Sequence, residues 1–206
     1  MLVFADNDIL IKLAGCSLLD RFLIALDQPE IRIAPATRFS LPQQAKKKIK
    51  DQGRVATLCN WLGNVEIAAE VQDLALLDRL SEIPGIDGGE GVLFAALCEA
   101  QHPTRLITGD RRALRTLLAH EQQLQDVFDR LKGSVYTLES ALLLLIEQFG
   151  FAEIDETMSA RAIEDKVIDM AFGANRNFEH ARQCLSSSTR EVLPLLANAD
   201  LILPIE

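Results

Sequence analysis

Short apolar runs alternate with longer segments of helical pattern over the first two-thirds of the chain, and this alternation limits the fold most strongly. The runs of buried-strand type cover residues 2–5, 31–34, 105–108 and 135–138. Strands that alternate with helices form a mostly parallel sheet with helices on both faces. The sequence therefore predicts an α/β fold in three layers, α/β/α.

The segments between these runs carry apolar residues three and four positions apart, as helices do. Residues 65–69 suit a short edge strand or a loop, and residues 83–89 form a loop rich in glycine and proline. The expected helices cover residues 9–26 with a break at Gly15, 41–62 with a break at Gly53, 71–80, 90–100, 111–119 and 122–131.

From residue 139 onward helical patterns dominate, so we expect two parts: an α/β domain over residues 1–138 and a helical extension over residues 139–206 packed on it. The expected elements of the extension are helices over 141–149, 157–172, 178–185 and 191–197, and a weak strand over 201–203. The extension holds twelve acids and five bases, which makes it acidic.

Composition excludes several classes of protein. With 49% hydrophobic and 25% charged residues among 206, the chain is not disordered overall, and no apolar run is long enough to span a membrane. Acids interrupt the first apolar segment, so we expect no secretory leader and a cytoplasmic location. The four cysteines are scattered without a metal-binding pair, which favours buried, reduced thiols over zinc.

The net charge of −9 argues against a polyanionic partner, but its distribution changes that conclusion. Residues 1–138 hold sixteen bases and eighteen acids, so the surplus belongs to the extension. Residues 36–54 carry six bases against one acid, and residues 104–116 carry four against one. These two segments supply positive surface for a nucleic acid.

Acidic residues follow two of the expected strands. Asp6 and Asp8 end the first, and Asp110 ends the run at 105–108, so parallel strands would bring them to one edge of the sheet. Glu90 opens an expected buried helix on the same stripe as Leu93. A buried carboxylate needs a partner, and a divalent cation is the natural one where acids converge.

Each acid also has a structural interpretation. Asp8, Asp87 and Asp110 immediately precede expected helices, where Asp is a good N-cap. Glu90 alone would complement a helix dipole. Residues that only cap helices need not lie near one another, whereas ligands of one metal ion must. Their positions in the fold therefore distinguish a metal site from a set of caps.

Three motifs carry a resemblance to a known family. They are Phe-Ala-Asp-Asn-Asp-Ile-Leu-Ile at residues 4–11, Gly-Gly-Glu-Gly-Val-Leu-Phe-Ala-Ala-Leu at 88–97 and Leu-Ile-Thr-Gly-Asp-Arg-Arg-Ala-Leu at 106–114. In order and in their spacing of roughly 85 and 20 residues, they resemble the PIN domain, a metal-dependent nuclease fold. The likeness spans residues 1–138. Many PIN domains have a further acid after the third motif, where this chain has Arg111, Arg112 and Arg115.

The resemblance implies hydrolysis of phosphodiester bonds, most often in RNA, with Mg²⁺ or Mn²⁺ as cofactor. Asp6, Glu90 and Asp110 would be the metal ligands and Asp8 an outer or alternate ligand. Thr108 would orient a carboxylate, and Asp87 would support the site or supply a further ligand.

Among the basic residues, Arg111 and Arg112 lie beside a proposed ligand and are expected to contact the substrate. Arg38, Lys46 and Lys47 are further candidates for binding the nucleic acid, although a solvated helix face also explains the lysines. The sequence leaves open a homodimer and an inhibitory, antitoxin-like protein as partners, and it indicates no membrane partner.

Two other functions compete. Asp6-Asn7-Asp8 and Gly109-Asp110 resemble the motifs of haloacid-dehalogenase-type phosphatases, but Leu114 stands where that family has an acid, and Glu90 has no role there. A PIN-like fold without activity would serve as a binding or assembly module.

Overall fold

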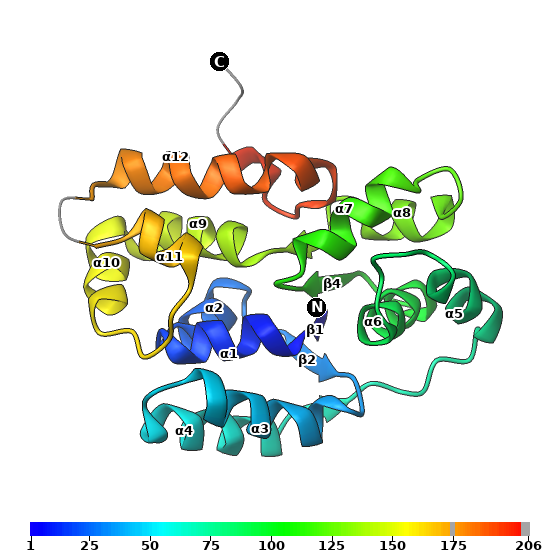
Figure 1. Ribbon diagram of the computed structural model, residues 1–206, viewed down its shortest axis with the longest axis horizontal. Helices are drawn as coiled ribbons and strands as arrows, with labels where there is room; N and C mark the ends of the chain where they lie inside the picture. The colour runs from blue at the N-terminus through cyan, green and yellow to red at the C-terminus, as the bar shows by residue number, and fades with distance from the viewer. Residues whose placement is uncertain (174–175, 203–206) are drawn as a thin grey trace.

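A sheet of five parallel strands forms the centre of the molecule, as the sequence predicts. The computed structural model describes residues 1–173 and 176–202. The strands are β1 (Leu2–Ala5), β2 (Glu30–Ile33), β3 (Glu66–Ile67), β4 (Thr104–Ile107) and β5 (Val135–Tyr136). Their order across the sheet is β3-β2-β1-β4-β5, and every neighbouring pair is parallel. Helices flank the sheet, which gives the three-layer α/β/α architecture (Figure 1).

Two helices follow β1, as expected from the break near Gly15. They are α1 (Asn7–Gly15) and α2 (Leu19–Ala25), and between them Ser17 has a positive φ of 57°, which no helix continues through. Two more, α3 (Thr37–Lys48) and α4 (Gln52–Gly63), follow β2. The break between them lies at Ile49–Asp51 and not at Gly53, because the Asp51 side chain caps α4.

The segment from β3 to β5 contains the helices on the other side of the sheet. They are α5 (Leu74–Ser81), α6 (Gly88–Glu99), α7 (Arg111–Ala119) and α8 (Gln125–Leu131). The most buried of them, α6, contacts both β1 and β4. Phe94 and Leu97 are buried almost completely, as expected for a helix that is apolar all round.

Helix α9 (Leu138–Phe149) starts directly after β5 and belongs to the same core. The expected strand at 135–138 ends early because Thr137 caps α9. The helix contacts α1, α2 and β5, and its residues Leu142 and Leu145 are fully buried. The hydrophobic core therefore continues across residue 138, where we expected one part to end and the next to begin.

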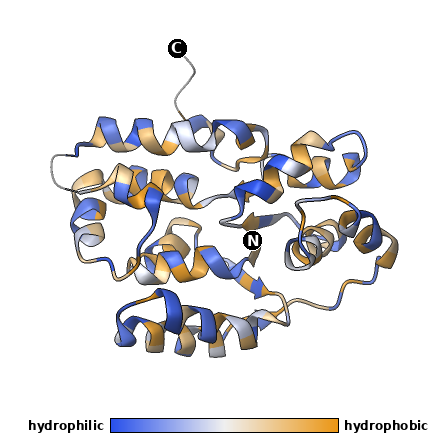
Figure 2. Cartoon of the chain, viewed as in Figure 1, coloured by the Kyte–Doolittle hydropathy of each residue, from blue (hydrophilic) through white to orange (hydrophobic). Residues whose placement is uncertain are grey.

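The remaining helices cover the side of the molecule formed by α9 (Figure 1). They are α10 (Phe151–Ser159), α11 (Lys166–Ala171) and α12 (Phe178–Thr189), followed by 3₁₀-helices at Arg190–Leu195 and Ala199–Leu201. Along α12, hydrophobic and hydrophilic residues interleave, which fits a helix with one buried face (Figure 2).

Three expectations for the extension were wrong. The helix expected over 157–172 is interrupted at residues 160–165, because Asp165 caps a new helix there. The segment 191–197 is 3₁₀-helical only to Leu195, and Leu196 then forms a parallel bridge with Val135. The strand expected at 201–203 does not form at residues 201–202, where the 3₁₀-helix ends, and residue 203 lies outside the described residues.

Residues 160–165, here called the strap, cross the ends of α1 and α3. Ala162 N donates to Gly15 O at 2.8 Å, and Lys50 N donates to Ala162 O at 2.8 Å. The Arg54 guanidinium donates to Ala160 O at 2.6 Å. The strap thereby ties the C-terminal helices to the helices that follow β1 and β2.

In the described part of the chain, no helix is both long and apolar enough to cross a membrane. All four cysteines are free thiols; Cys16 is buried as expected, whereas Cys59, Cys98 and Cys184 are only partly buried.

Candidate active site

A cleft of about 740 Å³ opens at the carboxyl edge of the sheet, beside the ends of β1 and β4. From β1 the chain continues to β2 on one side, and β4 lies on the other, so this is the point where the strand order reverses. Ligands of open parallel sheets bind at such points. The cleft is lined by Asp6, Asn7, Asp8, Ala34, Ala36, Thr37, Ser40, Gln44, Asp87, Gly88, Gly89, Glu90, Leu93, Gly109 and Asp110.

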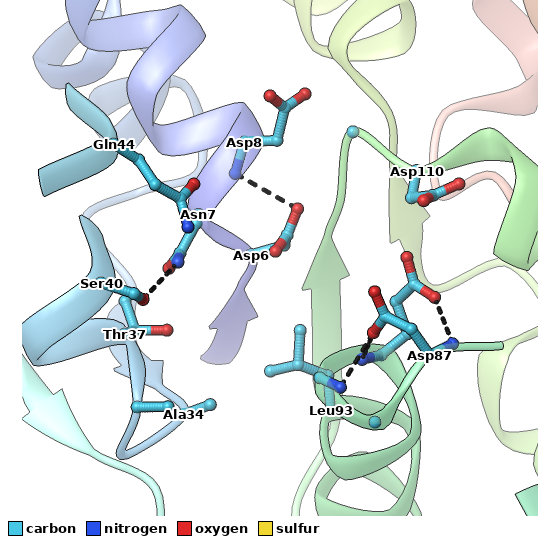
Figure 3. A pocket seen from close by; sticks show the side chains of 15 residues that line it. Asp6, Asn7, Asp8, Ala34, Thr37, Ser40, Gln44, Asp87, Leu93 and Asp110 are labelled. Atoms are coloured by element: carbon cyan, nitrogen blue, oxygen red, sulfur yellow. Dashed lines mark hydrogen bonds between the residues drawn. The ribbon is translucent and has the colours of Figure 1, made fainter. Parts of the chain in front are cut away.

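Asp6 lies at the end of β1, in the middle of the cleft (Figure 3). Its backbone N donates to Ile107 O at 2.9 Å, which joins the ends of β1 and β4. Its carboxylate caps α1 and accepts from Asp8 N at 3.3 Å. The pKa of Asp6 is raised, mainly by burial. Its backbone hydrogen bonds lower the pKa, and the nearby charges of Asp8 and Asp110 raise it.

Asp110 is held by the turn after β4. Its carboxylate caps α7 by accepting from Arg112 N at 2.7 Å and Ala113 N at 3.1 Å. The Thr108 hydroxyl accepts from Asp110 N at 3.1 Å, so Thr108 fixes the backbone of the turn. Between them Gly109 allows a close approach, because a Cβ there would lie 2.7 Å from Asp8 Oδ2.

Glu90 and Asp87 form a reciprocal capping box at the start of α6. Asp87 Oδ1 accepts from Glu90 N at 3.0 Å, and Glu90 Oε2 accepts from Asp87 N at 2.8 Å. Glu90 is only 8% exposed. Burial, together with a hydrogen bond to Asp110, raises the pKa of Glu90 to about 8. Burial opposes ionisation of Asp110 as well, but the hydrogen bonds from Glu90 and the α7 backbone outweigh it and lower the Asp110 pKa.

Asp8 differs from what the sequence suggests, because Asp6 and not Asp8 caps α1. Asp8 accepts from two ammonium groups, Lys12 at 2.8 Å on Oδ2 and Lys48 at 2.8 Å on Oδ1. Burial raises the pKa of Asp8, but these two lysines outweigh it and lower the pKa overall. Lys12 also reaches Asp165 of the strap at 2.9 Å. Sequence reasoning missed both lysines, although Asp8 and Lys12 have the i, i+4 spacing of a helical ion pair.

The wall of the cleft opposite Asp87 and Asp110 is polar and uncharged. Figure 3 shows Thr37, Ser40 and Gln44 on the side of Asp6 away from Asp87 and Asp110. Asn7 Nδ2 donates to Ser40 Oγ at 2.8 Å and joins the start of α1 to α3. These residues were not expected at the site, because only the tertiary fold brings α3 to the end of β1.

The expected nucleic-acid contacts lie outside the residues that line the cleft. Arg111 faces the interior, where its Nε lies 3.3 Å from Glu139 Oε1 and its guanidinium donates to Ser188 O. Arg38 donates to Val65 O at 3.3 Å. Arg112 is 65% exposed, and its Nη2 lies 3.9 Å from Asp110 Oδ2. Lys46 and Lys47 are exposed on α3.

The donor atoms of the cleft suit a hard cation. Asp6, Asp8, Glu90 and Asp110 offer only carboxylate oxygens, which Mg²⁺ and Mn²⁺ prefer. Among residues 1–173 and 176–202, no three or more His, Cys, Asp or Glu side chains are positioned to hold a metal ion together. The four acids line one cleft and thus fit the cation by chemistry, but side-chain rotation must bring their oxygens around it.

Comparison with protein-family models, curated proteins and solved structures finds no match to this chain. The function of the protein is therefore inferred from the residues and geometry of the cleft.

Proposed function

We propose that this protein is a metal-dependent nuclease that hydrolyses phosphodiester bonds of RNA. One observation carries the proposal: Asp6, Glu90 and Asp110, from three separate elements, line one open cleft where the strand order reverses. Three helix caps would not need to line one cleft, whereas ligands of one cation must. The substrate class rests on the resemblance of the three motifs to PIN domains.

In this proposal Asp6, Glu90 and Asp110 would hold Mg²⁺ or Mn²⁺, with Asp8 beside them. The bound ion would supply an activated water and neutralise charge on the phosphate. Thr108 fixes the turn that carries Asp110, and Asp87 fixes the first turn of α6, which carries Glu90. These two residues orient the carboxylates and do not take part in the reaction themselves.

The structure gives a reason to prefer a nuclease over the phosphatase. Leu114, where the phosphatase family has an acid, is fully buried in the core, so α7 directs that position away from the cleft. Glu90, which the phosphatase motifs leave without a role, lines the cleft. A homodimer, an antitoxin-like inhibitor and a cytoplasmic location stay predictions.

The inactive binding module is the second candidate, and one observation favours it. Arg111, Arg112 and Arg115 stand where many PIN domains have a further acid, so the cleft offers fewer carboxylates for a cation. An inactive module would bind no Mn²⁺ in the cleft, whereas a nuclease would bind it.

The decisive experiment compares the wild type, Asp6→Asn and Asp78→Asn in a cleavage assay with single-stranded RNA and Mn²⁺. Asn is as good an N-cap as Asp, so Asp6→Asn removes a charge and retains the cap. Asp78→Asn is the control, because Asp78 is exposed on α5 and does not line the cleft. We expect cleavage by the wild type and the control, and none by Asp6→Asn.

Other outcomes separate the candidates. Equal cleavage by Asp6→Asn would refute the site. Hydrolysis of small phosphate esters alone would favour the phosphatase. Calorimetry that detects no Mn²⁺ binding by the wild type, together with no cleavage, would favour the inactive module.

A further inference from the structure

Helix α3 forms the wall of the cleft that faces the acids, and its sequence is organised along one stripe. Thr37, Ser40 and Gln44 line the cleft at spacings of three and four residues. The next position of this stripe is Lys48, which contacts Asp8 at the cleft. The stripe thus consists of three uncharged polar side chains followed by one cation.

The charge of α3 is opposite to that of the other wall. No acid occurs in α3, and its last turn holds three lysines, whereas Asp87, Glu90 and Asp110 lie across the cleft. Figure 3 shows Thr37, Ser40 and Gln44 on one side of Asp6, and Asp87 and Asp110 on the other. A ligand in the cleft therefore meets carboxylates on one side and hydrogen-bonding groups with a terminal ammonium on the other.

Ser40 keeps a hydrogen-bond donor for such a ligand. Its oxygen accepts from Asn7 Nδ2 at 2.8 Å, which leaves the hydroxyl proton to donate. Gln44 offers both an amide donor and a carbonyl acceptor. These are the groups that contact sugars and the edges of unpaired bases.

We propose that α3 is the wall along which a single-stranded RNA lies. Lys48 binds a phosphate next to the scissile one, and Ser40 and Gln44 contact the sugar and base. From Ser40 to Lys48 the helix rises about 12 Å, whereas a stacked strand of a duplex carries one phosphate per ~3.4 Å along the helix axis. The wall is thus long enough for more than one nucleotide. This inference rests on the proposed nuclease function.

Lys48 replaces Lys46 and Lys47 in this assignment. The three lysines are consecutive, and Lys47 and Lys48 follow Gln44 by three and four residues, so spacing alone allows either to continue the stripe. None of the three lysines lines the cleft itself, but Lys48 contacts Asp8, which does.

The test measures binding of a fluorescein-labelled single-stranded RNA to the full chain by anisotropy, in EDTA, over a series of KCl concentrations. Loss of one phosphate contact lowers the slope of log K against log salt by about 0.7. We expect this decrease for Lys48→Gln and an unchanged slope for Lys132→Gln, which removes one charge from an exposed residue outside the cleft.

Two further variants test the neutral part of the wall. Gln44→Ala should weaken binding, and Gln43→Ala should not, because Gln43 is exposed and does not line the cleft. The pair differs only in its position on the helix.

The outcomes distinguish this proposal from the nuclease itself. If the wild type cleaves RNA while Lys48→Gln keeps the full slope and Gln44→Ala binds as the wild type does, α3 is not the substrate wall and the nuclease stands. A lower slope for Lys47→Gln in place of Lys48→Gln also overturns the assignment. Tighter binding of a DNA strand of the same sequence overturns RNA as the ligand. A wild type that neither binds nor cleaves overturns both proposals.

Discussion

Replacing Gly15 by alanine tests how tightly the strap is packed on α1. Gly15 is the last residue of α1, and Ile163 of the strap covers it. An added Cβ would lie 2.8 Å from Ile163 Cβ and 2.9 Å from its Cγ2. Because Cβ is fixed to the backbone, Ile163 relieves this clash only if the strap moves. The hydrogen bond from Ala162 N to Gly15 O holds the strap in place.

Two opposing terms set the size of the effect. Overpacking of a core position costs about 1–3 kcal/mol in the free energy of unfolding. Alanine in place of glycine in a helix returns about 0.5–1 kcal/mol. Gly15→Ala should therefore destabilise the protein by roughly 1 kcal/mol, between limits of about 0 and 2.5 kcal/mol. Gly63, the last residue of α4, is a matched control, because no atom lies within 4 Å of an added Cβ there. Gly63→Ala should stabilise by about 0.5–1 kcal/mol.

Urea unfolding of the two variants and the wild type measures both effects. The two substitutions should move the midpoint in opposite directions. Equal stability of Gly15→Ala and Gly63→Ala would show that the strap is not tightly packed on Gly15. Ile163→Gly removes the clashing atoms, so the double variant with Gly15→Ala should lose less stability than the sum of the two single changes.

Three further predictions concern buried groups outside the cleft. Arg111→Ala leaves Glu139, whose side chain is 4% exposed, without its cation. It should lower the free energy of unfolding in urea by about 2–4 kcal/mol, whereas Arg112→Ala should change it by less than about 0.5 kcal/mol. Equal effects of the two would contradict the interior role of Arg111. Thr137→Ala removes the buried cap of α9 and should lower the free energy of unfolding by about 1–2 kcal/mol; an unchanged urea midpoint would show that the cap is dispensable. Burial raises the pKa of Cys16 to about 12, so a thiol-reactive dye at about pH 8 should leave Cys16 unmodified until the protein unfolds. Mass spectrometry that detects the dye on Cys16 of the native protein would disprove this.

The strands and the acidic edge of the sheet were predictable from the sequence. A buried parallel strand is a short apolar run, and the chain order of runs and helices requires parallel pairing. Asp6 and Asp110 directly follow two such runs, so their common edge follows from strand direction alone. Glu90 was found by its place on the apolar stripe of α6.

The roles of the basic residues were not predictable in the same way. Arg111 follows Asp110 in the sequence, yet it turns inward to Glu139, 28 positions later. Lys48 is one of three similar neighbours, and only its distance to Asp8 distinguishes it. Such contacts depend on how helices pack around the sheet, which local pattern does not encode.

Local patterns in the sequence were sufficient to predict the layers of this protein and three of the carboxylates at the edge of its sheet, because strand periodicity and strand direction are local properties of the chain. Three further features came from folding alone: α3 faces those carboxylates, Lys48 contacts Asp8, and the strap packs on Gly15. Each of these contacts joins segments far apart in the sequence, and packing of the whole core sets their distances.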